Sequence, residues 1–448
     1  MFARSGFGLT NQERGRSARC ILALELESSG KIDTEIHSLI AYRLPVHSTT
    51  EVPEEKEESV EPENGWHDPK TPSFRRPRQE SDGQSNSCWV CEGLFEKVDE
   101  LVGKVGEEAE KWSFETFLVG CRIDPQTVER EQILWQECDP PSPEPLKEEM
   151  NRSIGKRFGQ RFPEKTHERS DPDIAFIVDP LYDSVKAQVK PIFIFGRYRK
   201  MVRGIPQTRW PCRTCRGKGC DQCGGTGRMY ETSVEELVGT RPKELFRGED
   251  FKLHGMGRED IDVLSLGSGR PFILEITKPK IREFDLDTIA NEINASTDER
   301  VEVFDLRYSV RKEIPLIKEG SYKKSYRARI STEGDFNEET LKYNISLLAQ
   351  SPIRQRTPTR VAHRRADKIR QRVVHKISAE VLPDGKAVVD LTTDGGLYIK
   401  ELLHGDEGRT EPSLSSLLGR DIVVETLDVT GVHYPDDENG PKGEQSHG

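Results

Sequence analysis

The chain has 448 residues, of which 33% are hydrophobic and 32% are charged, and its net charge is -11 at pH 7. A chain of this length is expected to form two to four domains. No apolar run approaches the roughly 18 residues that span a bilayer, and the first residues lack the apolar core of a secretion signal. We therefore expect a cytoplasmic protein with no membrane partner.

Residues 1–207 are predicted to form an N-terminal α+β domain. Residues 46–87 are rich in Pro, Glu and Ser and nearly free of aliphatic side chains, which indicates a disordered linker. Apolar residues between Leu94 and Val105 recur at helical spacing and predict an amphipathic helix. Short apolar runs separated by turn residues over 173–195 predict a small sheet.

A basic stretch with aromatic neighbours follows this sheet, with the sequence GRYRKMVRGIPQTRW. Cations beside aromatic rings suit phosphate contacts and base stacking. Arg197, Arg199 and Lys200 are therefore candidate RNA-binding residues. A solvated basic loop is the alternative interpretation.

Nine cysteines in a chain without a secretion signal favour metal binding over disulfides. Residues 208–228 contain two tandem CxxCxGxG units, whose four thiolates would complete a closed tetrahedral shell for a structural Zn²⁺. A redox CxxC would need a thioredoxin-like βαβ pattern, which is missing. We predict a zinc-binding connector with the ligands Cys212, Cys215, Cys220 and Cys223.

The same cysteine units also resemble the cysteine-rich region of DnaJ-type chaperones. The resemblance covers 16 residues, half the number of repeats found there, and the chain has no HPD motif. It supports a non-catalytic alternative, either a zinc-ribbon RNA-binding protein or a chaperone-like module.

Residues 229–435 are predicted to form an α+β catalytic domain. Strand-like segments alternate there with helices expected near 283–294, 336–349 and 397–404. The polar residues 436–448 are predicted to be a disordered tail. No nucleotide-binding or zinc-protease motif occurs in the chain, so we expect no catalytic or nucleotide cofactor.

Four motifs in this region occur in a characteristic order. They are HGMGREDIDVLSLGSGRPF, KKSYRARI, GGLYIKELLHGDEGRT and ETLDV. Together with TPTRVAHRRADKIR and the cysteine units, they resemble the archaeal-type tRNA pseudouridine synthases of T-loop uridines 54 and 55. The resemblance implies a THUMP-containing RNA-binding domain and a catalytic domain with a central mixed, mostly antiparallel sheet, whose halves flank the cleft.

The resemblance also implies roles for individual residues. Breaking the N-glycosidic bond of uridine requires an ionised carboxylate near the ribose, and Asp260 matches the catalytic aspartate of the family. It would act as a nucleophile on the sugar or as a base at C2′, and the sequence leaves both routes open. Lys400 would keep this carboxylate ionised, and Arg258 would hold the backbone of the target nucleotide.

The target uridine has to leave the RNA stack to be modified. Tyr326 is expected to cap the uracil face and to take part in proton transfer, and Leu427 to form an apolar wall of the pocket. Both residues could instead belong to the core, as most strand Tyr and Leu residues do.

Family members usually begin with a further CxxC that would complete a metal site with Cys88 and Cys91. This chain begins MFARSGFGLTN, without that pair. Cys88 and Cys91 are therefore provisional ligands.

The net negative charge is unevenly distributed. The segment from Arg354 to Lys376 contains nine cations and a single acid, Asp367, so it carries a charge of +8. Such density favours phosphate contact over an ordinary solvated helix face. The candidate RNA-binding residues of this segment are Arg360, Arg364, Arg365 and Arg370. We expect a monomer that binds the T-arm of tRNA.

Overall fold

The computed structural model describes residues 88–138, 143–320, 322–363 and 365–434. The predicted linker 46–87, the predicted tail 436–448 and Arg364 lie outside these described residues. The described part contains no helix that is long and apolar enough to cross a membrane.

The chain divides into two compact units between Gln188 and Val189. The strand Ile192–Lys200 (β5), which the sequence analysis places in the N-terminal domain, pairs with β7 and β8 of the second unit. Its nearly continuous burial explains this position, because a strand that is buried on both faces belongs inside a larger sheet. The second unit thus begins before the predicted boundary at residue 207.

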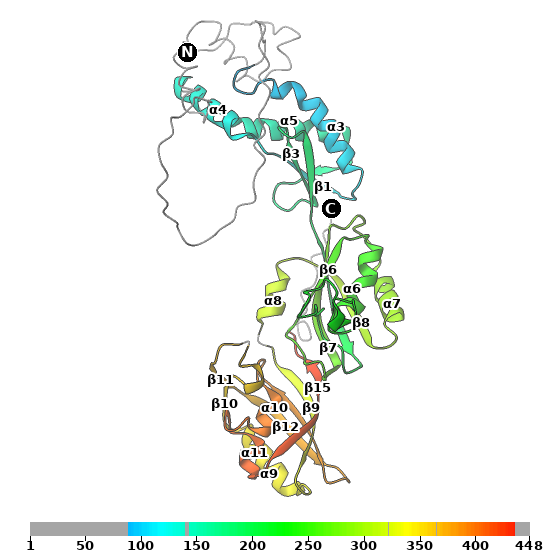
Figure 1. Cartoon of the computed structure of the whole chain (residues 1–448), viewed down its shortest axis with the longest axis vertical. Helices are drawn as coiled ribbons and strands as arrows, with labels where there is room; N and C mark the ends of the chain where they lie inside the picture. The colour runs from blue at the N-terminus through cyan, green and yellow to red at the C-terminus, as the bar shows by residue number, and fades with distance from the viewer. Residues whose placement is uncertain (1–87, 139–142, 321, 364, 435–448) are drawn as a thin grey trace. The chain divides into compact units, whose positions relative to one another are not determined.

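The first unit is an α+β module with one four-stranded sheet, in the order β2-β1-β3-β4 (Figure 1). The pairs β1–β2 and β1–β3 are parallel. Its elements are η2 (Leu94–Lys97), α3 (Val98–Ala109), β1 (Thr116–Cys121), α4 (Pro125–Cys138), α5 (Leu146–Arg161), β2 (Thr166–His167), β3 (Ile174–Asp179) and β4 (Ser184–Val189).

Helix α3 and the turn before it occupy the predicted amphipathic stretch. The apolar stripe Val98, Leu101, Val102 and Val105 is buried, while the charged positions between them face solvent. Helix α5 packs on β1, where the ring of Phe158 meets that of Phe117 at 4.8 Å. The aromatic core explains why this small sheet is stable.

The second unit is built on an eight-stranded sheet, in which β12-β13-β9-β15-β7-β5-β8 follow one another and β6 also pairs with β7. Its remaining elements are η3 (Asp221–Cys223), α6 (Val234–Leu245), β6 (Asp250–Gly255), β7 (Leu264–Thr277), α7 (Leu286–Ser296), β8 (Val301–Ser309), α8 (Glu313–Glu319), β9 (Lys324–Thr332), α9 (Glu338–Leu348), β10 (Ile353–Arg356), η4 (Thr359–Val361), β11 (Ile369–Arg372), β12 (Val374–Val381), β13 (Ala387–Thr393), α10 (Ile399–His404), β14 (Thr410–Glu411), α11 (Leu414–Leu418) and β15 (Ile422–Val432).

The predicted mixed, mostly antiparallel sheet is confirmed. The pairing of β15 with β7 is parallel and short, with Asp428 opposite Leu264 and Val429 opposite Ser265, whereas the other pairs described for this sheet are antiparallel. This short contact joins two halves, each with a core of its own, and a third apolar cluster from β5, β7, α8 and β15 lies across the junction. One core lies between β5–β8 and helices α6 and α7, and the other between β9, β12, β13 and helices α9 to α11.

Polar side chains start three of the helices, of which α7 and α9 lie where helices were predicted and α6 was not predicted. Ser233, Asp285 and Asn337 each accept a hydrogen bond from the backbone N–H three residues later. Such N-caps satisfy amides that have no partner within the helix. The segment 354–376, in contrast, forms β10, η4, β11 and the start of β12 instead of a helix.

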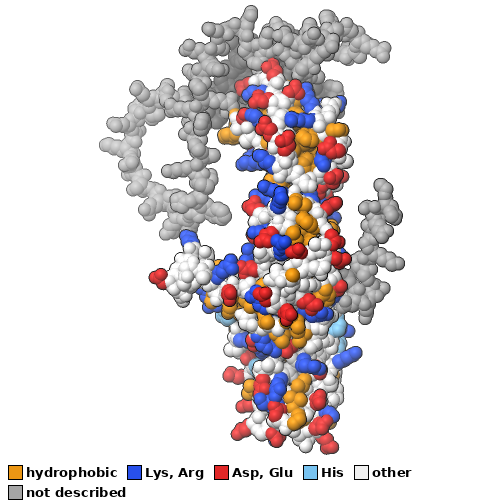
Figure 2. Space-filling view, turned by 90° about the vertical axis from the view of Figure 1, so that its right-hand side faces the viewer, with side chains coloured by type: hydrophobic (Ala, Val, Ile, Leu, Met, Phe, Trp, Pro, Cys, Tyr) orange, Lys and Arg blue, Asp and Glu red, His pale blue; other side chains and the backbone are white. Residues whose placement is uncertain are grey.

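Charges of both signs are interspersed over the face shown in Figure 2, with apolar side chains in small groups. The net charge of -11 is therefore a poor guide to any one surface.

Candidate active site

The GRED motif forms a loop between β6 and β7, at the junction of the two half-sheets. A turn closes the loop, with the Val263 N–H donating to the Asp260 carbonyl at 3.1 Å. Gly257 has a φ of +74°, and a Cβ there would lie 2.7 Å from Lys324 Nζ. Only glycine meets both conditions without strain.

The loop borders a cavity of about 740 Å³ that lies wholly within the second unit. Its lining comes from this loop, residues 256–263, which we call the catalytic loop, and from segments far away in the sequence, namely β9, β15, η4 and the turn before α10. This volume is within the ~300–1,000 Å³ usual for ligand sites and is large enough for a nucleoside.

Asp260 lines this cavity and is held by Arg360. The Arg360 Nη1 donates to Asp260 Oδ2 at 2.9 Å, and the Arg360 Nε donates to Glu401 Oε1 at 2.6 Å. Glu401 is only 1% exposed. Burial lowers the pKa of Arg360, but the hydrogen bonds and charges of Glu401 and Asp260 together outweigh this effect. The net pKa is therefore above the ordinary value. The guanidinium is thus a permanent cation fixed between two carboxylates.

Lys400, the expected partner of Asp260, bonds the other carboxylate of the loop. Its Nζ donates to Asp262 Oδ2 at 2.8 Å. Burial raises the pKa of Asp262, but the hydrogen bond and charge of Lys400 outweigh it and the net pKa is lowered. The sequence analysis missed Arg360 in this role because it assigned the whole basic segment to phosphate contacts. One signal was available, since Arg360 is the cation of the TPTRV motif.

Tyr326 and Leu427 line the same cavity, from the adjacent strands β9 and β15. Burial raises the pKa of Tyr326 to about 12, although the charge of Arg270 acts in the opposite direction. Leu427 is 8% exposed and also belongs to a core cluster. The structure therefore places both side chains in the cavity that Asp260 lines, while Leu427 belongs to the core as well.

Arg258 is exposed at the rim of the cavity. Its guanidinium lies over the ring of Trp210, 5.1 Å from the ring centroid. Stacking on the indole ring fixes the position of the Arg258 guanidinium and leaves it exposed to solvent. This arrangement suits contact with a nucleotide backbone.

A buried ionic network underlies the loop and was not predicted. Arg270, 1% exposed, pairs with Glu259 through Nε and Oε2 at 2.8 Å, and its Nη1 donates to the Met256 carbonyl at 2.7 Å. The Tyr198 hydroxyl donates to Glu259 Oε1 at 2.8 Å, and Gln207 donates to the same hydroxyl at 3.0 Å. The network fixes Glu259, the residue before Asp260, and the Met256 carbonyl at the start of the loop.

In the first basic stretch, two of the three cations predicted to contact phosphates are buried, and the role of Arg199 stays a prediction. Arg197 is 5% exposed and donates to the Ser268 carbonyl, and Lys200 is fully buried and donates to the Ile261 carbonyl. The Arg199 guanidinium donates hydrogen bonds to the Gly267 carbonyl and to the Glu302 carboxylate. These side chains belong to an inner strand of the sheet, so their cationic groups bind protein acceptors.

The second basic segment contributes directly to the cavity. Arg365 and Arg370 line it, and Arg365 is exposed. Arg370 donates to Thr357 Oγ1 at 3.1 Å and remains partly exposed. The structure thus brings these two cations to the same cavity as Asp260.

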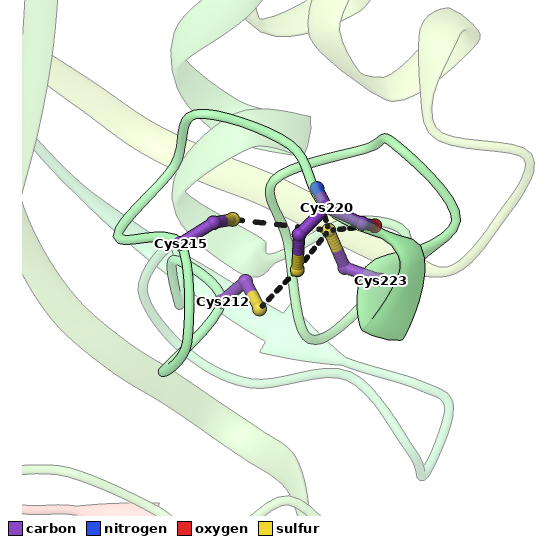
Figure 3. A group of neighbouring side chains, drawn as sticks. All are labelled: Cys212, Cys215, Cys220 and Cys223. Atoms are coloured by element: carbon purple, nitrogen blue, oxygen red, sulfur yellow. Dashed lines mark hydrogen bonds between the residues drawn. The ribbon is translucent and has the colours of Figure 1, made fainter.

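The four cysteines of the connector come together as predicted. Figure 3 shows their sulfurs pointing toward one another, with Sγ–Sγ distances of 3.9 Å for Cys212–Cys220 and Cys215–Cys223 and 3.7 Å for Cys220–Cys223. A tetrahedral ion with metal–sulfur bonds of about 2.3 Å requires sulfurs about 3.8 Å apart. The cluster can therefore hold a metal ion.

Backbone amides donate hydrogen bonds to two of these sulfurs. The Gly219 N–H donates to Cys215 Sγ, and the N–H groups of Cys220 and Gly227 donate to Cys223 Sγ. Desolvation opposes ionisation at Cys223, yet the hydrogen bonds lower its pKa to about 6. A thiolate at that position favours a bound cation.

Cys88 and Cys91 lie in the first unit and are 4% and 5% exposed. The turn that follows them has the Leu94 N–H donating to the Cys91 carbonyl at 2.9 Å. Among the described residues, the one group of three or more possible metal ligands is the connector cluster. The role of this pair as metal ligands stays a prediction.

Two family models match the chain. Residues 193–433 match the model described as Pus10, C-terminal, and residues 101–179 match the Pus10 THUMP domain, archaeal. The two matches together cover most of the described part of both units.

Curated relatives match over nearly the whole chain. The tRNA pseudouridine synthase Pus10 of Methanothrix thermoacetophila is 37% identical over 96% of this chain and 89% of the relative. That of Methanocaldococcus jannaschii is 41% identical over 95% and 88%. A solved structure titled Crystal Structure of a Cbf5-Nop10-Gar1 Complex overlaps 53% of this chain and 48% of its own, at 16% identity and a TM-score of 0.28. The two family-model matches and the identities to the curated relatives show that the chain belongs to the Pus10 family of tRNA pseudouridine synthases.

Proposed function

We propose that the protein isomerises uridine to pseudouridine in the T-loop of tRNA, at position 54, position 55 or both. The observation that supports this most strongly is the carboxylate of Asp260, which lines a nucleoside-sized cavity and is bound by the fixed cation of Arg360. The Pus10 family relationship supports the activity, and the T-loop positions rest on the resemblance of the motifs.

The geometry suits a carboxylate that has to stay ionised. Arg360 neutralises part of the charge of Asp260 while Glu401 holds the guanidinium from the other side. An anionic Asp260 can attack C1′ of the ribose or remove a proton from C2′, and either route breaks the bond between C1′ and N1. Arg360 bonds Oδ2 of Asp260, and within the part of the chain that the structure describes the other oxygen has no bonded partner, so it is available to the sugar.

Base flipping gives roles to Tyr326, Leu427 and Arg258. In this proposal the uracil leaves the RNA stack and lies against the Tyr326 ring and the Leu427 side chain. Arg258, already stacked on Trp210, contacts the backbone of the flipped nucleotide. Lys400 acts through Asp262 and so orients the end of the catalytic loop.

The tRNA itself is bound by several parts of the chain. The residues matching a THUMP domain are proposed to bind the tRNA away from the chemistry, while Arg365 and Arg370 contact phosphates at the cavity. The connector cysteines hold a structural Zn²⁺, which supplies stability and takes no part in the reaction because all four positions are filled by sulfur.

The test uses the full chain and unmodified tRNA transcripts, with pseudouridine mapped by carbodiimide-blocked primer extension. We expect a stop at position 54, 55 or both. Transcripts with cytidine at position 54 or at position 55 show which uridine is the substrate. Pseudouridine elsewhere would refute the T-loop assignment, and tRNA binding without any pseudouridine would favour a non-catalytic zinc-ribbon or chaperone-like protein.

A further inference from the structure

Lys324 lies in the catalytic cavity, although no role has been assigned to it. It begins β9 two residues before Tyr326, and alternate residues of a strand face the same side. Both side chains line the cavity. A Cβ at Gly257 would lie 2.7 Å from Lys324 Nζ, so the amino group lies against the loop that carries Asp260.

The amino group of Lys324 has no bonded partner among the described residues. Three other cations of the site are paired with carboxylates: Arg270 with Glu259, Lys400 with Asp262 and Arg360 with Asp260. A largely buried lysine without a directly bonded carboxylate is unusual, because burying an unpaired charge is costly. Its position calls for a ligand or a chemical role.

The surroundings of Lys324 make its proton labile. Burial and the nearby charge of Arg270 lower its pKa to about 8, and Glu259 offsets this only in part. Tyr326, in contrast, has a pKa of about 12 and keeps its proton at neutral pH. The other charged groups that line the cavity are Arg258, Asp260, Asp262, Lys318, Glu319, Arg360, Arg365, Arg370 and Arg372.

We propose that Lys324 is the base that removes the C5 proton of the uracil after the new bond between C1′ and C5 has formed. This inference rests on the proposed pseudouridine synthase activity. The neutral amine takes the proton and becomes an ammonium group. The electron pair of the C5–H bond forms the C5=C6 double bond, the C6=N1 pair moves to N1, and N1 takes a proton from water. The step needs no oxidant and no cofactor.

The direct test measures loss of the C5 hydrogen. A tRNA transcript with tritium at C5 of uridine releases tritium into water when this step occurs. Under single-turnover conditions we expect Lys324→Met to slow the release about 100-fold or more, as for other general bases. Lys324→Arg keeps the positive charge but cannot accept a proton, so it should be equally slow. Release at the wild-type rate in either variant would overturn the proposal.

A second substrate separates chemistry from misfolding. 5-Fluorouridine has no proton at C5, so the base is not needed for the new carbon–carbon bond. Lys324→Met should therefore rearrange 5-fluorouridine RNA at close to the wild-type rate. It should also show a larger deuterium isotope effect at C5 of uridine than wild type. Equal slowing of both substrates would mean a structural role and would refute the proposal.

The pH dependence gives an independent readout. A base with a pKa near 8 has to be neutral to act, so the wild-type rate of tritium release should rise up to about pH 8 and then level off. Lys324→Met should lack this rise. If wild-type protein binds tRNA but releases no tritium, the proposed function itself fails. If wild type releases tritium and the Lys324 variants match it, only the present inference fails.

Discussion

The cysteine connector and the catalytic loop are both short segments with little regular structure, yet they are held in different ways. The thiols of the connector lie within 12 consecutive residues, and its backbone amides point at its own sulfurs. The catalytic loop is held by Arg270 of the following strand β7 and by side chains from β5 and η4, which are remote in sequence. The first is a local structure and the second depends on the fold of the whole unit.

This difference has energetic consequences. With the proposed Zn²⁺ bound, the stability of the connector should follow metal content, and loss of the ion should leave the rest of the sheet intact. The catalytic loop depends on buried ion pairs, for which loss of one partner leaves an unpaired charge in the interior. Changes at the two regions should therefore be separable by experiment.

The largest effect is expected at the connector. Cys215→Ser and Cys220→Ser each remove one ligand, and structural zinc in small fingers contributes about 10–16 kcal/mol of binding free energy. We expect the loss of about one Zn²⁺ per chain, measured by elemental analysis of the purified protein. Retention of a full equivalent of zinc in both variants would rule out the assigned ligands.

The next effect is expected for Arg270→Met, which leaves Glu259 buried without its cation. Removal of one partner of a buried pair costs about 3–5 kcal/mol, so the free energy of unfolding in urea should fall by that amount. Arg327→Met is the matched control, because Arg327 pairs with Asp390 at the surface and such pairs contribute about 0–1 kcal/mol. A similar loss in both variants would contradict the importance of burial.

A smaller effect is expected from Glu401→Gln, which removes the buried anion that holds Arg360. Misplacement of Arg360 should slow pseudouridine formation about 10- to 100-fold, in line with about 1.4 kcal/mol per factor of ten. The affinity for tRNA should stay the same, because Glu401 lies below the cavity surface. Glu425→Gln, at an exposed pair with Lys386, serves as the control. Weaker tRNA binding without a slower reaction would argue against a positioning role.

The smallest effect is expected from the cations at the cavity. If Arg365 and Arg370 each contact one phosphate, Arg365→Gln and Arg370→Gln should each lower the salt dependence of tRNA binding, with a slope smaller by about 0.9. Lys342→Gln, on α9 and paired with Glu338, should leave the slope unchanged. If the salt slope is unaltered in all three variants, Arg365 and Arg370 do not contact the RNA phosphates.

Local patterns in the sequence predicted the connector, the helix at 98–109 and most strands, because spacing and alternation determine them directly. The family resemblance of the motifs assigned Asp260, Tyr326 and Leu427 to one site, and all three line the same cavity. The sequence could not show that Arg360 pairs with Asp260, because the two residues are 100 positions apart and meet only once the sheet is formed. The sequence predicted Lys200 to be a surface cation, because the burial of its strand also depends on pairing with strands that follow much later in the chain. In the structure Lys200 is fully buried.

The central claim is that Asp260, and not its neighbour Asp262, carries the chemistry. The most direct measurement compares single-turnover pseudouridine formation by Asp260→Asn and Asp262→Asn on the same tRNA, with binding measured in parallel. We predict that Asp260→Asn binds tRNA but forms no detectable pseudouridine, while Asp262→Asn keeps a measurable rate. Full activity of Asp260→Asn would contradict the account.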